Sequence, residues 1–130
     1  CTHYPKGITP KKGQFLLRLV KYFDPKSIKI YSDSKDFASL FPSSLTEITS
    51  EQKDMIILYQ RDNKPIVKEL LAQMHNDSIL VLISPHEKEN ENFFKQLAEN
   101  KAFTVVIDTF FFALFFVRSE QERESFVIRI

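Results

Sequence analysis

Few residues of this chain have the chemistry of a catalytic site, and a serine and a histidine are the closest pair. Ser84 and His86 flank Pro85 directly after an apolar run. A serine hydroxyl beside an imidazole can act as a nucleophile with its general base. The stretch Ser84-Pro85-His86-Glu87 also matches a capping box, in which the serine caps a helix and the glutamate is its third residue. We favour the capped helix, because the sequence has no nucleophile elbow, phosphate-binding loop or dinucleotide fingerprint.

The three histidines do not predict a metal site. His75 ends a predicted helix, His3 lies in the N-terminal arm, and His86 opens another predicted helix. No second histidine or cysteine lies at the spacing that metal ligands need. We therefore predict no metal, and a surface position for His86.

Three acidic residues follow predicted strands. Asp33, Asp36 and Asp62 would lie near the carboxyl ends of those strands, the edge at which α/β folds place their ligands. A ligand site there is one interpretation. We favour solvated loop residues.

The composition predicts one small globular domain and excludes several classes of function. The chain has 130 residues, with 13 Phe but only 2 Gly, and sites that wrap a nucleotide need backbone without side chains. A net charge of +1 gives no electrostatic footprint for nucleic acid or an acidic membrane, so neither partner is predicted. The single cysteine, Cys1, allows no internal disulfide, and we predict a cytoplasmic protein. Lipidation of Cys1 is an alternative that no signal segment supports.

Alternating helices and strands would position these residues. Residues 1–11, with Pro5, Gly7 and Pro10, predict an irregular arm before a single domain over residues 12–130. Apolar stripes at helical spacing and short apolar runs define the elements. Predicted helices cover residues 12–23, 34–41, 63–75 and 84–100, and predicted strands cover residues 27–31, 45–48, 55–59, 79–83, 103–107, 111–117 and 126–130.

This order predicts a three-layer α/β/α fold with a mostly parallel sheet and an antiparallel C-terminal hairpin. The strands at 55–59 and 79–83 are apolar on both faces, as expected for strands covered by helices on both sides. The longest apolar run, residues 105–117, is shorter than the roughly 20 residues that a membrane-spanning helix needs. Buried strands are the better explanation for it.

Several stretches resemble class I S-adenosylmethionine-dependent methyltransferases of the bacterial O-methyltransferase-like kind. Residues 14–23, followed by Pro25-Lys26 and a strand, resemble the helix that leads into the first strand of that family. Residues 76–82 resemble the turn and fifth strand, and residues 105–116 with 126–129 resemble the sixth and seventh strands and the end. The resemblance covers most of the chain and implies a Rossmann-like sheet whose seventh strand is antiparallel. The resemblance implies a shortened member, because too few residues precede Met55 for the usual second helix, third strand and third helix.

The glycine-rich turn of that family is replaced here. In the family the first strand ends in an acidic residue and the turn E-x-G-x-x-x-G, and the matching stretch is Ile30-Tyr31-Ser32-Asp33-Ser34-Lys35-Asp36. Ile30 stands in place of the acid, and Ser32 and Asp36 stand in place of the glycines. The turn must bring bare backbone against the cofactor, so side chains at both places predict a crowded pocket.

Other family positions are also replaced. Tyr59 stands where an aspartate ends the fourth strand, and Ile83-Ser84 stand where an acidic pair follows the fifth strand, with only His86 left nearby. Those carboxylates would serve a metal and the substrate hydroxyl. Glu47 is the nearest candidate for the acid that grips the cofactor ribose. We expect no catalytic residue and no bound cofactor, and the vestigial pocket positions are Tyr31, Ser32, Asp33, Asp36, Glu47, Tyr59, Ser84 and His86.

These losses predict a non-catalytic, methyltransferase-like protein that acts in binding or assembly. The alternative is an active methyltransferase with an atypical pocket, in which Glu47 or Asp62 would contact the ribose of S-adenosylmethionine. A compatible third hypothesis is self-association or a protein partner at the terminal strands, because an exposed edge at residues 126–130 could pair with another chain.

Overall fold

The computed structural model describes residues 10–32, 35–47, 51–60, 64–118 and 124–128. Its helices are α1 (Pro10–Phe23), α2 (Lys35–Ala38), α3 (Ser43–Thr46), α4 (Val67–Ala72) and α5 (Glu91–Glu99). Its strands are β1 (Ile28–Ser32), β2 (Lys53–Tyr59), β3 (Met74–Ile83), β4 (Val105–Asp108), β5 (Phe112–Phe116) and β6 (Glu124–Val127).

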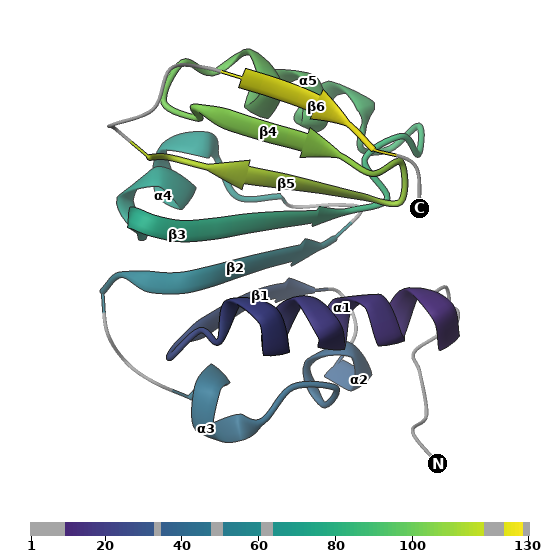
Figure 1. Cartoon of the computed structure of the whole chain (residues 1–130), viewed down its shortest axis with the longest axis vertical. Coiled ribbons are helices and arrows are strands. Elements are labelled where there is room, and N and C mark those ends of the chain that lie inside the picture. The colour runs from purple at the N-terminus through teal and green to yellow at the C-terminus, as the bar shows by residue number, and fades with distance from the viewer. Residues whose placement is uncertain (1–9, 33–34, 48–50, 61–63, 119–123, 129–130) are drawn as a thin grey trace.

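The six described strands form one mixed sheet in the order β1-β2-β3-β5-β4-β6. Figure 1 shows this order from bottom to top, with the arrow of β5 opposed to the others. β1, β2 and β3 are parallel, β5 is antiparallel to both β3 and β4, and β6 is parallel to β4. The predicted antiparallel hairpin is therefore β4–β5, and the carboxyl ends of the five other strands share one edge of the sheet.

Helices cover both faces of the sheet, which gives the predicted three layers. On one face, α1 and α2 bury Leu16 and Phe37 against Met55 and Ile57 of β2. On the other face, α4 and α5 bury Leu70 and Leu97 in a second cluster. Because successive side chains of a strand point to opposite faces, β2 supplies Met55 and Ile57 to the first cluster and Ile56 and Leu58 to the second. The fully apolar run therefore follows from burial on both sides.

The structure corrects two N-terminal predictions. α1 begins at Pro10, two residues before the predicted start at Lys12, and proline is well tolerated in a first helical turn. The strand predicted at residues 45–48 is wrong, because Ser43–Thr46 form the short helix α3. Pro42 precedes this helix with φ −60° and ψ 132°, and the Glu47 N–H donates to the Ser43 carbonyl at its end. A turn begun by proline thus outweighs the strand propensity of the apolar residues.

The helix predicted before β3 is too long. α4 covers only Val67–Ala72 of the predicted residues 63–75, because Ile66, the residue after Pro65, is extended with ψ 152°. The chain returns to a strand at Met74, so His75 belongs to β3 and not to a helix.

The capping box predicted at residues 84–87 is wrong. Ser84 has a φ of 56°, whereas a helix cap needs an extended backbone, and α5 begins only at Glu91 after Asn90. Residues 84–90 instead form a series of turns between β3 and α5. This change moves Ser84 and His86 from a helix to a loop at the carboxyl edge of the sheet.

The last strand begins earlier than predicted. β6 covers Glu124–Val127, and its partner is the parallel strand β4.

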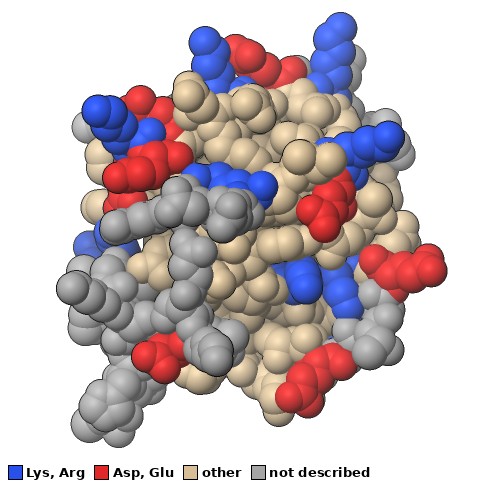
Figure 2. All heavy atoms as spheres, turned by 180° about the vertical axis from the view of Figure 1, so that it is seen from behind, with Lys and Arg blue, Asp and Glu red and all other residues tan. Residues whose placement is uncertain are grey.

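None of the described helices has the length and apolar character that crossing a membrane requires. On the face turned away from the viewer of Figure 1, basic and acidic side chains are interspersed among uncharged residues (Figure 2).

Candidate functional site

Four of the predicted site residues lie at two places on the carboxyl edge of the sheet. Ser32 and Tyr59 are the last residues of β1 and β2 and lie opposite each other in the strand register. Ser84 and His86 follow the end of β3, beside the turn that joins β4 to β5. Asp33 and Asp62 lie outside the described residues.

Aromatic side chains fill the space beside the ends of β1 and β2. Phe37, from the short helix that follows β1, has none of its surface exposed to solvent. Its ring centroid lies 4.7 Å from that of Tyr59 and 5.5 Å from that of Phe41. These three rings occupy the side of the sheet on which α1 and α2 lie.

Tyr31 belongs to the other face of the sheet, where it is held by neighbours. The Gln73 side-chain amide donates a hydrogen bond of 2.7 Å to the Tyr31 hydroxyl. The Lys29 ammonium lies 5.3 Å from the centroid of the Tyr31 ring. Tyr31 therefore has a structural partner at its polar end and packs in the second core cluster.

The structure does not bring Asp36 and Glu47 into a common site. Both are exposed, Asp36 on α2 and Glu47 at the end of α3. Within the described part of the chain, neither carboxylate forms a hydrogen bond or an ion pair. They are solvated side chains, and Glu47 has no contact that would hold a ribose-binding geometry.

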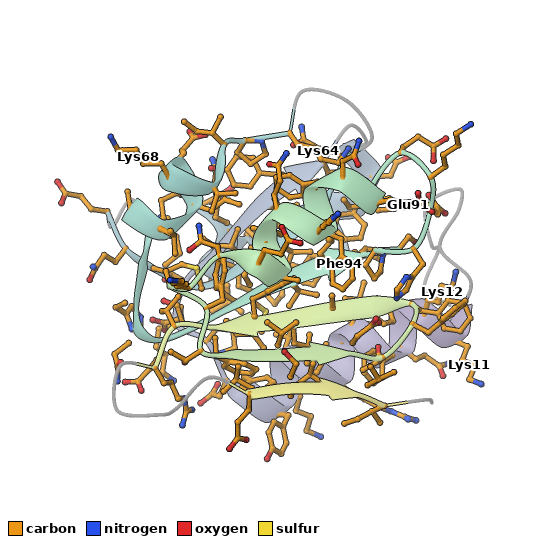
Figure 3. The ribbon with its side chains drawn as sticks, turned by 90° about the horizontal axis from the view of Figure 1, so that it is seen from above. Lys11, Lys12, Lys64, Lys68, Glu91 and Phe94 are labelled. Atoms are coloured by element: carbon orange, nitrogen blue, oxygen red, sulfur yellow. The ribbon has the colours of Figure 1, made fainter. Side chains whose placement is uncertain are left out.

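His86 and Asp108 form the most organised polar contact at the carboxyl edge. The His86 Nε2 lies 2.6 Å from Asp108 Oδ2, and the Asp108 side chain is only 12% exposed. The imidazole stacks on the Phe110 ring at 5.3 Å and meets the Phe94 ring edge to face at 5.3 Å. Figure 3 shows Phe94 on α5 above the sheet. A carboxylate bonded to one nitrogen orients an imidazole, and the 40% exposure of the His86 side chain leaves it open to solvent.

The backbone on both sides of this pair is strained. Ser84 and Phe110 have φ values of 56° and 78°, a region that residues other than glycine avoid. Hydrogen bonds hold both conformations: the Ser84 N–H donates to the Phe111 carbonyl at 2.7 Å, and the Phe110 N–H donates to Asp108 Oδ1 at 2.8 Å. Asp108 therefore orients His86 with one oxygen and stabilises the strained turn with the other.

Asp108 is the site residue that sequence reasoning missed. The sequence signal is its position, because it is a charged residue at the end of an apolar strand in the run 105–117. His86 was predicted on the surface of a helix, so no partner for it was sought. The structure pairs the two across 22 positions of the sequence.

A second histidine–aspartate pair lies at the opposite, amino edge of the sheet. His75 Nε2 lies 2.7 Å from Asp54 Oδ1, and the Lys26 N–H donates to Asp54 Oδ2 at 2.7 Å. The His75 Nδ1 accepts a hydrogen bond from the Asp77 N–H, so both ring nitrogens have partners. This pair lines a cavity of about 250 Å³, and its bonds link the starts of β1, β2 and β3. It is a structural junction.

The pKa of Asp54 is lowered at this junction. Burial alone would raise this pKa, but the hydrogen bond from the Lys26 N–H, the hydrogen bond and charge of His75 and the charge of Lys26 together outweigh burial.

No group of three His, Cys, Asp or Glu side chains suited to a metal ion occurs among the described residues.

We predict that Asp54→Asn lowers the free energy of unfolding by about 1 kcal/mol at pH 7, because the amide loses the charge-assisted bonds to Lys26 and His75. The folded-state pKa is depressed, so the contribution of Asp54 is complete above its unfolded pKa of about 3.9 and disappears as the pH falls through the lower folded value. Urea unfolding between neutral and acidic pH measures this difference.

Asp77→Asn is the matched control, because Asp77 lines the same cavity but its carboxylate has no ion pair in the described residues. It should leave the unfolding midpoint unchanged. A difference between the parent and Asp54→Asn that stays constant to the lowest pH would contradict the linkage.

The chain matches no protein-family model, no curated protein and no solved structure. The side chains at the carboxyl edge and their contacts are therefore the basis for assigning a function.

Proposed function

We propose that this chain is a Rossmann-like, methyltransferase-like domain that has lost its S-adenosylmethionine site and acts in binding or assembly. The sheet supports the first part. The resemblance matches β1, β2, β3, β4 and β5 to the first, fourth, fifth, sixth and seventh strands of that family. β5, the counterpart of the antiparallel seventh strand, is the one antiparallel strand of the described sheet.

The shortened connection between β1 and β2 also fits this proposal. Only the short helices α2 and α3 are described between these strands. β1 consequently lies at one edge of the described sheet, where the resemblance would place further strands. Among the described residues, no strand that could carry the ribose-binding acid lies between β1 and β2.

The burial of Phe37 is the main observation in support of the proposed loss of the cofactor site. The cofactor would lie over the end of the first strand, against a turn of bare backbone. In this chain α2 follows β1 and places the Phe37 ring, with no exposed surface, against Tyr59 at the end of β2. A ligand at this place would have to displace a packed aromatic ring, and removing a buried Phe side chain costs about 3–5 kcal/mol.

The opposite edge of the sheet supports a role in assembly. β6 is the last strand in the order, so one side of its backbone has no strand partner among the described residues. Val127 and Ile128 at its end are 76% and 47% exposed. An edge strand with exposed apolar side chains is a template for pairing with another chain.

We predict that S-adenosylmethionine and its demethylated product leave the melting temperature unchanged. A ligand at 100 times its dissociation constant would add about 2.7 kcal/mol to the free energy of unfolding. For a domain of this size that gain would raise the melting temperature by several degrees. Differential scanning fluorimetry with each compound, and with adenosine as a control, measures the shift.

The variant Glu47→Ala distinguishes the two functional hypotheses. A shift of several degrees with S-adenosylmethionine that Glu47→Ala abolishes would show an atypical cofactor pocket and overturn the proposed loss of the site. The expected result is that S-adenosylmethionine leaves the melting temperature of both the parent and this variant unchanged.

We also predict that the chain self-associates through β6 as its concentration rises. Val127→Lys should return it to the monomeric mass in light scattering, because a charge on an edge strand opposes pairing. Ile66→Lys is the matched control, since Ile66 is 68% exposed but lies at the start of α4, away from this edge. A parent chain that stays monomeric at every concentration would contradict assembly through β6.

A further inference from the structure

A cavity of about 600 Å³ opens between the first turns of α1 and the turn that joins β4 to β5. Figure 3 shows Lys11 and Lys12 at the start of α1, at the same end of the molecule as this turn. The volume lies within the range of about 300–1,000 Å³ that is usual for small-molecule sites. The residues that matter for its chemistry are Lys11, Lys12, Phe15, Arg18, Phe111 and Phe112.

The wall of this cavity is aromatic. The rings of Phe15 and Phe112 stack with their centroids 4.9 Å apart, and Phe112 is almost fully buried. Phe111 adds a third ring that is 39% exposed, and the Lys12 ammonium lies 4.4 Å from its centroid. A flat apolar body can therefore contact the Phe15 and Phe111 rings here, while the buried Phe112 ring supports Phe15 from behind.

The mouth of the cavity is basic. Lys11 and Arg18 are both exposed and lie on the same helix as Phe15. None of the described residues that line the cavity is acidic. Two exposed cations next to an aromatic wall favour a ligand with one anionic group and an apolar body.

The conformation of the adjoining turn keeps aromatic rings at the surface. Phe110 has a φ of 78°, a conformation that costs a non-glycine residue about 1–2 kcal/mol. Phe110 is 57% exposed and packs edge to face on Phe111. A hairpin turn under no other constraint would use glycine or asparagine at such a position.

We infer that this cavity binds a small organic anion, a carboxylate or sulfonate with an aromatic body. The inference is independent of the lost cofactor site, since none of the residues beside Tyr59 that close that site lines this cavity. Stacking on Phe15 and Phe111 holds the aromatic body, and Lys11 and Arg18 hold the anionic group.

Two fluorescent probes with similar bodies test the inference on the full folded chain. The probe 8-anilinonaphthalene-1-sulfonate carries a negative charge, whereas N-phenyl-1-naphthylamine has the same two ring systems and is neutral. We expect saturable binding of one sulfonate probe per chain, and binding of the neutral probe that is at least about tenfold weaker, as expected when a charge-assisted contact is lost.

Variants identify the residues that hold each part of the probe. The double variant Lys11→Ala/Arg18→Ala should weaken sulfonate binding about tenfold and leave neutral-probe binding unchanged, while Phe111→Ala should weaken both. Lys21→Ala is the matched control for charge, and Tyr22→Ala is the control for an exposed aromatic, because both residues lie at the other end of α1. Circular dichroism confirms that each variant is folded.

Each of the following results would overturn the inference: equal affinity for the two probes, equal losses in Lys11→Ala/Arg18→Ala and Lys21→Ala, or no saturable binding. Co-sedimentation with phosphatidylglycerol vesicles in the absence of saturable probe binding would instead assign this surface to an acidic membrane. Displacement of the sulfonate probe by naphthoate more readily than by dodecanoate would support an aromatic ligand; the reverse order would contradict it.

Discussion

The Phe37 and Tyr59 rings are in contact beside the carboxyl ends of β1 and β2, and the proposed loss of the cofactor site depends on this contact. The ring of Phe37 has no exposed surface, and burying a phenylalanine side chain stabilises a fold by about 1.5–3 kcal/mol. The same contact attaches α2 to the sheet directly after β1. A ligand at this position would have to open the core cluster that also contains Leu16 and Met55.

The other half of the same edge is built differently. After β3, the backbone is strained at Ser84 and Phe110. These conformations bring His86, Asp108 and two exposed phenylalanines together. Asp108 holds His86 with one oxygen and the strained turn with the other. This turn also forms one wall of the cavity beside α1.

Burial patterns made the sheet predictable, whereas local turn chemistry was misleading. The apolar runs of β2 and β3 predicted strands covered on both faces, since only two-sided burial removes the alternation of polar residues. The capping-box pattern at Ser84 failed because a tertiary hydrogen bond to Phe111 selects a left-handed conformation there. The strand predicted at residues 45–48 failed because Pro42 starts a helical turn. The contacts of His86 with Asp108 and of Phe37 with Tyr59 depend on the fold, so no local pattern predicts them.

Site-resolved NMR tests directly whether the end of β1 is closed. Backbone amide spectra of the labelled chain would be recorded with increasing S-adenosylhomocysteine, up to millimolar concentration. If Phe37 and Tyr59 occupy the volume, the amide signals of Ser32, Phe37 and Tyr59 stay unchanged throughout the titration. Saturable shifts at these three residues would show that the ligand enters and would contradict a closed site.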